Sequence, residues 1–317
     1  MSEHATFLRD INDGLSQKPK YISSHYFYDS IGDKLFQQIM DMPEYYLTNS
    51  ELEIFREQAD KIIQSFEINP GEEFELIELG AGDGEKTQHL LQNQLEKDYS
   101  FKYIPVDISA NSLKVISKRF QNLFPDLKIE PKQGEYFHVL DDLFASPKPK
   151  VILFIGSNLG NMEDEVAKKF LLKIAQHLKT NEKLLLGLDL MKSRDIILPA
   201  YNDASGITRD FNLNLLTRIN NELGGNFNLE NFEHAPEYSE EEGIAKSFLK
   251  SKTQQTVYIS ALERSFDFEK DELIHTEISR KYNDEILGDL LQNTQLEITQ
   301  KFLDSQEYFA DYIITKK

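Results

Sequence analysis

Three glycines at alternate positions follow an apolar run and can bring the backbone against a nucleotide-like ligand. Residues 74–79 read FELIEL, and Gly80, Gly82 and Gly84 follow before a segment with helical spacing. A strand, a glycine-rich turn and a helix are the arrangement in which backbone approaches a ligand closely, because glycine tolerates dihedral angles that other residues avoid. Taken alone, the motif is also compatible with an ordinary turn.

Two acidic residues favour a ligand site. Glu78 lies at the end of the apolar run, which is unusual for a buried strand, and Asp107 closes the next apolar run. An acidic side chain at that place can accept both hydroxyls of a ribose. A dinucleotide fingerprint needs a third glycine at position 85, which is Glu, and no Gly-Lys-Ser/Thr follows for a P-loop. The pattern ELGAGDG before a strand that ends in Asp is instead typical of class I S-adenosylmethionine-dependent methyltransferases.

The elements that must position these residues alternate regularly from residue 74 onward. Strands are predicted at 74–79, 101–107, 150–156 and 182–190, and helices at 85–95, 111–124 and 165–178. Such alternation indicates βαβ units and a parallel sheet covered by helices on both faces.

The regular alternation of strands and helices ends after residue 189. A helix is predicted at 209–223, two long strand-like runs at 253–268 and 272–282, and an antiparallel pair at 296–317. We therefore predict an α/β fold with a mostly parallel twisted sheet and an antiparallel C-terminal strand, formed by 49–191 and 282–317. A smaller α+β domain is predicted from 1–48 and 192–281.

Composition narrows the class of partner. The formal net charge is −19, from 54 acidic and 35 basic residues, and such a surface repels phosphate backbones and anionic lipids. We expect a small-molecule substrate, no nucleic-acid or membrane partner, and a monomer. The chain has no cysteine and begins without a signal-peptide pattern, so a cytoplasmic location is expected. The seven histidines show no metal-ligand spacing, and no metal is predicted.

Five longer motifs, in order along nearly the whole chain, resemble one family. They are YFYDSIGDKLFQQIMDMPEYYLTNSE (26–51), FIGSNLGN (154–161), LLLGLDLMK (184–192), AYNDASGITRDFNLNLL (200–216) and HTEISRKY (275–282). Together they resemble the histidine-specific Nα-methyltransferase family, whose best-known members make trimethylhistidine (hercynine) in ergothioneine biosynthesis. The resemblance implies a Rossmann-like methyltransferase domain and a substrate domain built from the N-terminus and an insertion. It also implies S-adenosylmethionine-dependent methylation of the α-amine of free L-histidine, giving the mono-, di- and trimethylated products.

The resemblance implies roles for individual residues. Donor contacts are implied for Gly80, Lys86, Asp107, Glu135 and Tyr136, with Gly82 in the same loop. Substrate contacts are implied for Tyr45, Asn161, Tyr201, Glu277 and Ser279, with Tyr28, Phe36 and Thr208 lining the pocket. Tyr28 (or a water) is the candidate proton acceptor, and Asn161 can donate to the substrate carboxylate and accept from its amine.

The chemistry of these residues suits histidine. Glu277 and Ser279 lie two apart on a predicted strand, so they project from one face and can hold both imidazole nitrogens. Aromatic faces at Tyr28, Phe36 and Tyr45 suit the fixed positive charge of a trimethylated amine. Each feature also has a plainer interpretation: the pair can belong to a solvated face, the aromatic side chains can be ordinary packing, and Asn161 can cap a helix.

One region departs from the family pattern. Family members usually read RIEM before an aromatic–Leu pair, whereas residues 244–249 here read IAKSFL, which places Lys246 and Ser247 at the Glu and Met positions. Serine in place of methionine would enlarge and polarise a wall of the histidine pocket. Two alternatives therefore stay open: a relative that methylates another amino acid or imidazole-containing amine, and a catalytically silent ligand-binding relative. A nucleic-acid base methyltransferase is disfavoured, because GSNLGN stands where those enzymes carry Asp/Asn-Pro-Pro-aromatic.

Overall fold

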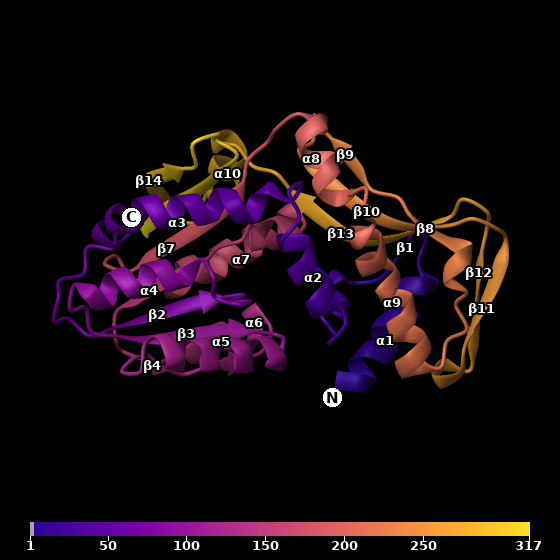
Figure 1. Ribbon diagram of the computed structural model, residues 1–317, viewed down its shortest axis with the longest axis horizontal. Coiled ribbons are helices and arrows are strands. Elements are labelled where there is room, and N and C mark those ends of the chain that lie inside the picture. The colour runs from indigo at the N-terminus through magenta and orange to yellow at the C-terminus, as the bar shows by residue number, and fades with distance from the viewer. Residues whose placement is uncertain (1–2) are drawn as a thin grey trace. The chain divides into compact units, whose positions relative to one another are not determined.

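The chain folds into two compact units, each built from two separate stretches of sequence. The computed structural model describes residues 3–317 (Figure 1). Unit 1 consists of residues 1–46 and 192–279, and unit 2 consists of residues 47–191 and 280–317. Each unit is described by itself below.

A mixed sheet of eight strands forms the centre of unit 2 within the described residues. Its strands are β2 (Phe74–Leu79), β3 (Phe101–Asp107), β4 (Lys128–Ile129), β5 (Lys132–Gln133), β6 (Lys150–Phe154), β7 (Lys183–Asp189), β14 (Leu296–Leu303) and β15 (Phe309–Lys316). Their order is β14-β15-β7-β6-β2-β3-β4, and β5 also pairs with β3. The pairs β6–β7, β2–β6 and β2–β3 are parallel, whereas β15 runs antiparallel to β7 and β14.

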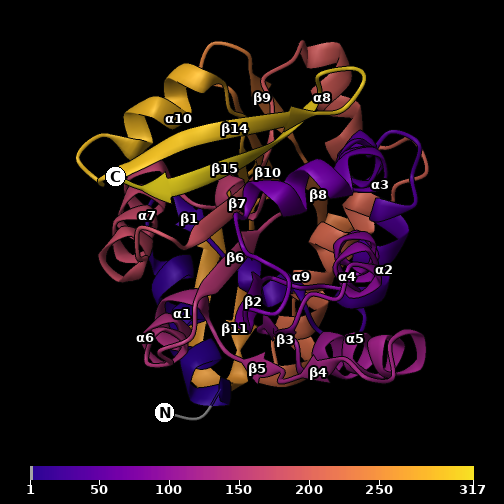
Figure 2. The ribbon, with the colours of Figure 1, turned by 90° about the vertical axis from the view of Figure 1, so that its left-hand side faces the viewer.

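Helices cover both faces of this sheet. They are α3 (Tyr46–Ser65), α4 (Thr87–Glu96), α5 (Ala110–Leu123), α6 (Tyr136–Phe144), α7 (Asp164–His177) and α10 (Asp284–Leu291), with a 3-10 turn η2 (Asn158–Asn161). In Figure 2, α6, α7 and α10 lie on one side of the sheet and α3, α4 and α5 on the other. Successive residues of β2 accordingly enter different cores, with Leu76 on one face and Ile77 on the other. The predicted α/β class, with parallel strands and an antiparallel C-terminal strand, is confirmed.

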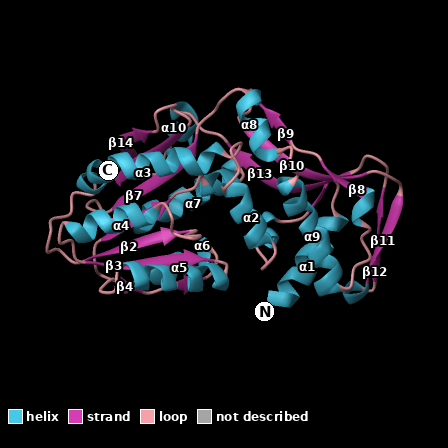
Figure 3. Cartoon of the chain, viewed as in Figure 1, coloured by secondary structure: helices cyan, strands magenta, loops and turns pink. Residues whose placement is uncertain are grey.

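Unit 1 combines helices with a second, smaller sheet (Figure 3). Its helical elements are α1 (Glu3–Ser16), η1 (Ser24–Phe27), α2 (Gly32–Met40), α8 (Arg194–Tyr201), α9 (Ile207–Leu223), η3 (Leu229–Asn231) and η4 (Ser260–Leu262). Its strands are β1 (Lys20–Tyr21), β8 (Phe232–His234), β9 (Glu237–Ser239), β10 (Ile244–Ser251), β11 (Gln255–Ile259), β12 (Arg264–Phe268) and β13 (Leu273–Arg280). The main sheet has the order β1-β13-β10-β8, with β9 on β10, while β11 and β12 form a separate hairpin.

One sequence-based prediction in unit 1 is wrong. The run 253–268 was expected to be one long strand, but it folds back on itself as the β11–β12 hairpin, in which Val257 pairs with Phe266. The turn contains no Gly, Pro or Asn, and it closes with Glu263 at a φ of 48°. Apolar residues alternate in the same way before and after this turn, and the turn lacks the Gly, Pro or Asn that would usually indicate one. The sequence pattern therefore does not reveal that the chain changes direction here.

None of the helices formed by residues 3–317 is long and apolar enough to cross a membrane.

Candidate active site

The glycine loop of unit 2 begins where β2 ends, at the carboxyl edge of the parallel strands. Gly80, Gly82 and Gly84 all have positive φ, at 76°, 55° and 71°. A Cβ at Gly80 would lie 2.6 Å from the Tyr136 hydroxyl oxygen and 2.7 Å from the Asn158 side-chain nitrogen, whereas a Cβ at Gly82 would meet no atom within 4 Å. The loop therefore packs tightly at its first glycine and leaves open space at its second.

The third glycine has a packing role. A Cβ at Gly84 would lie 2.6 Å from the Phe120 ring and 2.7 Å from the Ile116 side chain, both on α5. The loop thus has a glycine for close packing one residue earlier than the position at which a dinucleotide fingerprint has its third glycine.

Asp107, at the end of β3, holds the glycine loop. Its Oδ2 accepts the Gly82 N–H at 3.1 Å and its Oδ1 accepts the Ser109 N–H at 2.8 Å. An acidic side chain at the end of this strand is the usual acceptor for ribose hydroxyls in this type of fold.

The other predicted donor residues surround the same edge of the sheet. Tyr136 begins α6, stacks edge-on against Phe154 with ring centroids 5.2 Å apart, and has a pKa raised by burial. Glu135 is exposed at the N-cap position of α6. Lys86 lies at the N-cap position of α4, and its ammonium forms an ion pair with the buried Glu51 carboxylate.

The loop after β6 carries Asn161. Its backbone turns sharply at Gly156 and Ser157, with φ of 71° and 57°, before the 3-10 turn η2. Asn158 Nδ2 donates to Ile155 O at 2.8 Å, and Asn161 is exposed at the end of η2. The N-cap position of α7 is occupied by Glu163, so Asn161 does not cap that helix.

In unit 1, Tyr201 and Ser279 are brought together from α8 and β13. The Tyr201 hydroxyl donates to Ser279 Oγ at 2.8 Å, and both residues are buried. His234 Nε2 lies 2.8 Å from the Tyr201 carbonyl oxygen. Glu277 precedes Ser279 by two residues on β13, so both side chains leave the strand on one side. Thr208 is buried at the start of α9, where its N–H donates to Asp203 Oδ1 at 2.8 Å.

The three predicted pocket aromatics of unit 1 form one cluster. Tyr28 and Phe36 meet edge-on with ring centroids 5.7 Å apart, and Phe36 and Tyr45 do so at 6.4 Å. Phe211 of α9 joins them, 5.9 Å from Phe36 and 6.1 Å from Tyr28. Phe211 is buried, whereas the other three rings are partly exposed. The structure thus brings the three rings together with a fourth, Phe211, which the sequence analysis did not assign to the pocket.

Two contacts define how β10 lies beside β13. Thr276 Oγ1 donates to Ser247 O at 3.0 Å, and the rings of Phe248 and His275 lie 5.3 Å apart. Successive side chains of a strand point to opposite faces, so the side chains of Phe248 and His275 share one face of the sheet. The side chains of Ser247 and Thr276 share the other face.

The same alternation separates the two residues that depart from the family pattern. Ser247 is buried on the Thr276 face, whereas Lys246 lies on the face that carries Glu277. The sequence analysis placed Ser247 in a wall of the histidine pocket. The structure instead places Lys246, not Ser247, on the Glu277 face.

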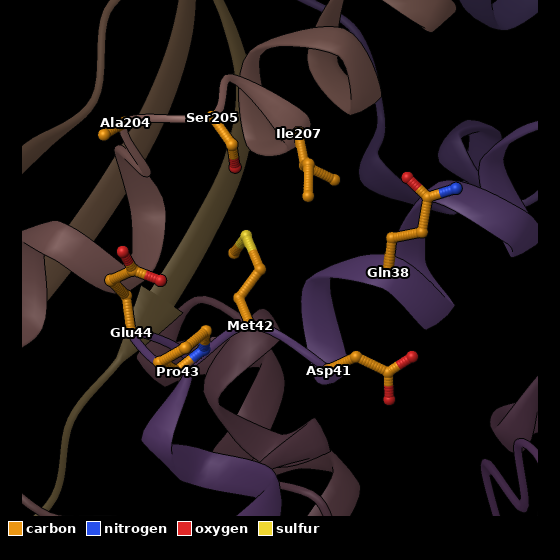
Figure 4. Close-up of a pocket in the computed structure, with 8 residues that line it drawn as sticks. All are labelled: Gln38, Asp41, Met42, Pro43, Glu44, Ala204, Ser205 and Ile207. Carbon is orange, nitrogen blue, oxygen red and sulfur yellow. The ribbon is translucent and has the colours of Figure 1, made fainter.

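A cavity of about 530 Å³ opens in unit 1 next to two predicted pocket residues. Its lining residues are Gln38, Asp41, Met42, Pro43, Glu44, Ala204, Ser205 and Ile207. Figure 4 shows Met42 extending toward Ser205 and Ile207, while Asp41 points away from them. Tyr45 and Thr208 directly follow the two lining segments in sequence.

Comparison with known proteins identifies the family to which the chain belongs. The family described as histidine-specific methyltransferase, SAM-dependent, matches residues 7–316. The chain belongs to this family. A histidine N-alpha-methyltransferase of Mycolicibacterium smegmatis is 33% identical over 87% of this chain and 84% of its own length. The protein of the same name from Mycobacterium tuberculosis is 30% identical over 90% and 87%. An L-tryptophan methyltransferase of Psilocybe serbica is 26% identical over 95% and 90%.

The residues of this methyltransferase that the sequence analysis predicted to contact the donor have chemistry that suits S-adenosylmethionine. Gly82 leaves open space, the Asp107 carboxylate is of the type that accepts ribose hydroxyls, and the Lys86 ammonium can attract a carboxylate. The sequence analysis named these residues but did not name Glu51, the partner of Lys86. Glu51 is the last residue of the segment 26–51 quoted above. Nothing in that segment indicates that its partner lies at position 86.

Glu78 of this methyltransferase is a structural acid beneath the glycine loop. It is buried, accepts Thr87 Oγ1 at 2.6 Å, and accepts the Tyr103 hydroxyl. Burial raises the pKa of its carboxyl to about 7, although the hydrogen bonds from Thr87 and Tyr103 act to lower it. Glu78 therefore ties β2 to α4 and β3, and it titrates near neutral pH.

Replacing Glu78 by glutamine is expected to flatten the pH dependence of stability. The pKa of about 7 in the folded protein lies above that of an unfolded glutamate, about 4.3. Stability from the protonated carboxyl is thus fully present below about pH 4.3 and is lost as the pH rises through the folded-state pKa. Relative to the wild type, E78Q should gain on the order of 3 kcal/mol between about pH 5 and pH 8. Urea unfolding of both proteins across this pH range measures the difference in their free energies of unfolding. If that difference did not change with pH, the raised pKa assigned to Glu78 would be wrong.

Proposed function

We propose that this protein transfers methyl groups from S-adenosylmethionine to the α-amine of free L-histidine, in up to three successive steps. The observation that carries the proposal is the arrangement on β13 of unit 1. There, Ser279 Oγ is held by Tyr201 at 2.8 Å, and Glu277 lies two residues before it on the same side of the strand. A carboxylate and a hydroxyl at this spacing suit the two nitrogens of an imidazole. Membership of the histidine-specific family supports the same acceptor.

Residues of unit 2 are proposed to hold the donor. When bound, S-adenosylmethionine supplies an electrophilic methyl group on a positively charged sulfur. Asp107 accepts the ribose hydroxyls while it keeps Gly82 in place, and Lys86 attracts the carboxylate of the amino-acid end. Glu135 and Tyr136, at the start of α6, contact the adenine side. These roles use charge-assisted hydrogen bonds, which are the stronger class in proteins.

The acceptor amine must be neutral when it reacts, because a protonated amine has no lone pair. Asn161 is proposed to donate to the histidine carboxylate and to accept from the amine, which orients the lone pair. Much of the rate then comes from positioning. The proton leaves to Tyr28 or to a water.

The aromatic cluster suits the product of repeated transfer. A trimethylated amine carries a fixed positive charge and cannot donate a hydrogen bond. The faces of Tyr28, Phe36 and Tyr45 can stabilise such a cation without a hydrogen-bond acceptor. This cluster therefore supports the proposal that methylation continues to the trimethyl stage.

Mass spectrometry of reaction products tests the proposed function. The protein is incubated with S-adenosylmethionine and each of a panel of free amino acids, with monomethyl- and dimethylhistidine included. We expect histidine to gain one, two and three methyl groups and the methylated histidines to be carried to the same end product. No gain on histidine or its methylated forms would contradict the proposal.

A second acceptor is favoured by one observation. Lys246 lies on the Glu277 face of the unit 1 sheet and adds a positive charge there, where the family pattern has a glutamate. Such a change can alter which side chain is accepted next to Glu277, and an L-tryptophan methyltransferase is among the relatives. Methyl gain on another amino acid, with none on histidine, would support this alternative in the same experiment.

A further inference from the structure

Glu51 of α3 holds two elements at the ligand-binding edge of the unit 2 sheet. Its side chain is 1% exposed and forms an ion pair with Lys86 Nζ. Its Oε1 also accepts the N–H of Gly156 at 2.8 Å. Lys86 follows the glycine loop, and Gly156 lies just beyond β6. Both positions are at the carboxyl end of parallel strands, where open α/β sheets bind their ligands.

Lys86 lies at the N-terminus of α4, where an unpaired positive charge is unfavourable. The N-terminus of a helix carries partial positive charge, and burial of an ammonium is costly. Burial acts to lower the pKa of Lys86, but the charge and hydrogen bond of Glu51, with Asp311 and Glu78 nearby, raise it above its usual value. Glu51 is therefore the main group that keeps this ammonium charged.

Asp311, a second buried acid, does not take this role. It lies on β15 opposite Gly187, and a Cβ at Gly187 would lie 2.2 Å from Glu51 Oε1 and 2.9 Å from Asp311 Oδ1. Neither carboxylate oxygen of Asp311 has a hydrogen-bond partner within residues 3–317. Burial, together with the charge of Glu51, raises the pKa of Asp311 well above its usual range. Glu51, and not Asp311, is therefore the carboxylate that pairs with the Lys86 ammonium.

The Lys86 ammonium keeps donors for a ligand. It has three N–H groups, and its hydrogen bond in the described part of the chain goes to Glu51. Its side chain is 21% exposed, whereas that of Glu51 is fully enclosed. The remaining N–H groups can therefore reach an anionic ligand that Glu51 cannot contact.

We propose that Glu51 is a positioning residue for donor binding. It keeps Lys86 charged and aimed at the donor carboxylate, and through the Gly156 N–H it fixes the loop that carries Asn158 and Asn161. The first role rests on the proposed function, in which Lys86 contacts the donor. Glu51 itself touches neither the donor nor the amino acid.

The variants E51Q and E51A separate the two roles. Glutamine keeps an oxygen for the Gly156 N–H but offers no charge to Lys86. For E51Q we expect the Kd of S-adenosylhomocysteine, measured by titration calorimetry, to rise at least about tenfold. The KM for S-adenosylmethionine should rise with it, while the KM for histidine stays within about twofold. E51A loses both contacts and is expected to raise the KM for histidine as well.

A pH profile distinguishes positioning from general support of the fold. Without Glu51 the partly buried Lys86 should lose its proton more easily, so donor affinity in E51Q should fall as the pH rises from about 7 to 9. Wild-type affinity should stay flat over that range. The titratable groups that face Lys86 are Glu51, Asp311 and Glu78. Because Asp311 is a second acid that faces Lys86, the double variant E51Q/D311N removes both acids and should show the steepest fall.

Glu182 provides a matched control. It is also buried and accepts a backbone N–H, that of Lys179 at 2.9 Å, but it precedes β7 at the opposite end of the sheet. E182Q should lower the thermal stability of the ligand-free protein without changing the Kd of S-adenosylhomocysteine. A wild-type Kd and a flat pH profile in E51Q and the double variant would overturn the inference, as would an equal loss in E182Q. Failure of the wild type to bind S-adenosylhomocysteine would instead contradict the proposed donor.

Discussion

Replacing Asp107 by alanine is expected to weaken donor binding by about 100- to 10,000-fold. The carboxylate holds the glycine loop through the Gly82 N–H at 3.1 Å and the start of the next segment through the Ser109 N–H at 2.8 Å. It is also the proposed acceptor for two ribose hydroxyls. Hydrogen bonds to a charged group are worth about 1.5–3 kcal/mol each, and about 1.4 kcal/mol corresponds to a tenfold change in Kd. Calorimetric titration with S-adenosylhomocysteine measures the loss directly.

Asp304 supplies the control for loop support. Its carboxylate accepts the N–H groups of Tyr308 and Phe309 at 2.8 and 2.7 Å, in the turn between β14 and β15. Asp304 therefore anchors backbone as Asp107 does, but on the antiparallel edge of the sheet, away from the glycine loop. D304A should reduce the melting temperature and leave the Kd of S-adenosylhomocysteine unchanged. If D107A reduced the melting temperature without weakening the binding of S-adenosylhomocysteine, the proposed contact between Asp107 and the ribose would be wrong.

Replacing Glu277 by alanine is expected to raise the KM for histidine by about 10- to 100-fold. An imidazole N–H that loses its acceptor in a buried site costs about 1–3 kcal/mol. Glu277 lies on β13 in unit 1, whereas the proposed donor residues belong to unit 2. We therefore expect the Kd of S-adenosylhomocysteine to stay within about twofold of the wild-type value. Steady-state kinetics with histidine and a parallel titration with S-adenosylhomocysteine give the two numbers.

Glu233 is a suitable comparison for Glu277. It lies on β8 of the same sheet and pairs with Lys250 at 2.5 Å on the surface. E233A removes a glutamate from this sheet, so it should leave the KM for histidine near the wild-type value. An equal loss of donor and histidine affinity in E277A would show that Glu277 supports the fold and does not recognise the imidazole.

Much of the unit 2 fold could be predicted because its signals are local in sequence. Each buried parallel strand is a short apolar run, and each is followed by a helix, so β2, β3, β6 and β7 were found within two residues of their observed ends. The unmarked turn between β11 and β12 lacked such a signal, and there the prediction was wrong. Side-chain alternation alone cannot tell one long strand from two strands that turn back on each other.

The sequence by itself determined the family, the glycine loop and the place of Asp107, because these depend on residue types at fixed spacing within one βαβ unit. Only the tertiary structure decided which distant side chains became partners. It paired Lys86 with Glu51 and brought Phe211 into the aromatic cluster. It also placed Lys246 on the Glu277 face of the sheet.

The physical reason is that partner choice depends on burial and strand register. A partly buried ammonium pairs with a carboxylate that the fold places within reach, and here α3 places Glu51 there from 35 positions away in the sequence. A strand presents a side chain to one face or the other according to its pairing with a neighbour. Neither burial nor strand register can be deduced from the residue types of a single segment.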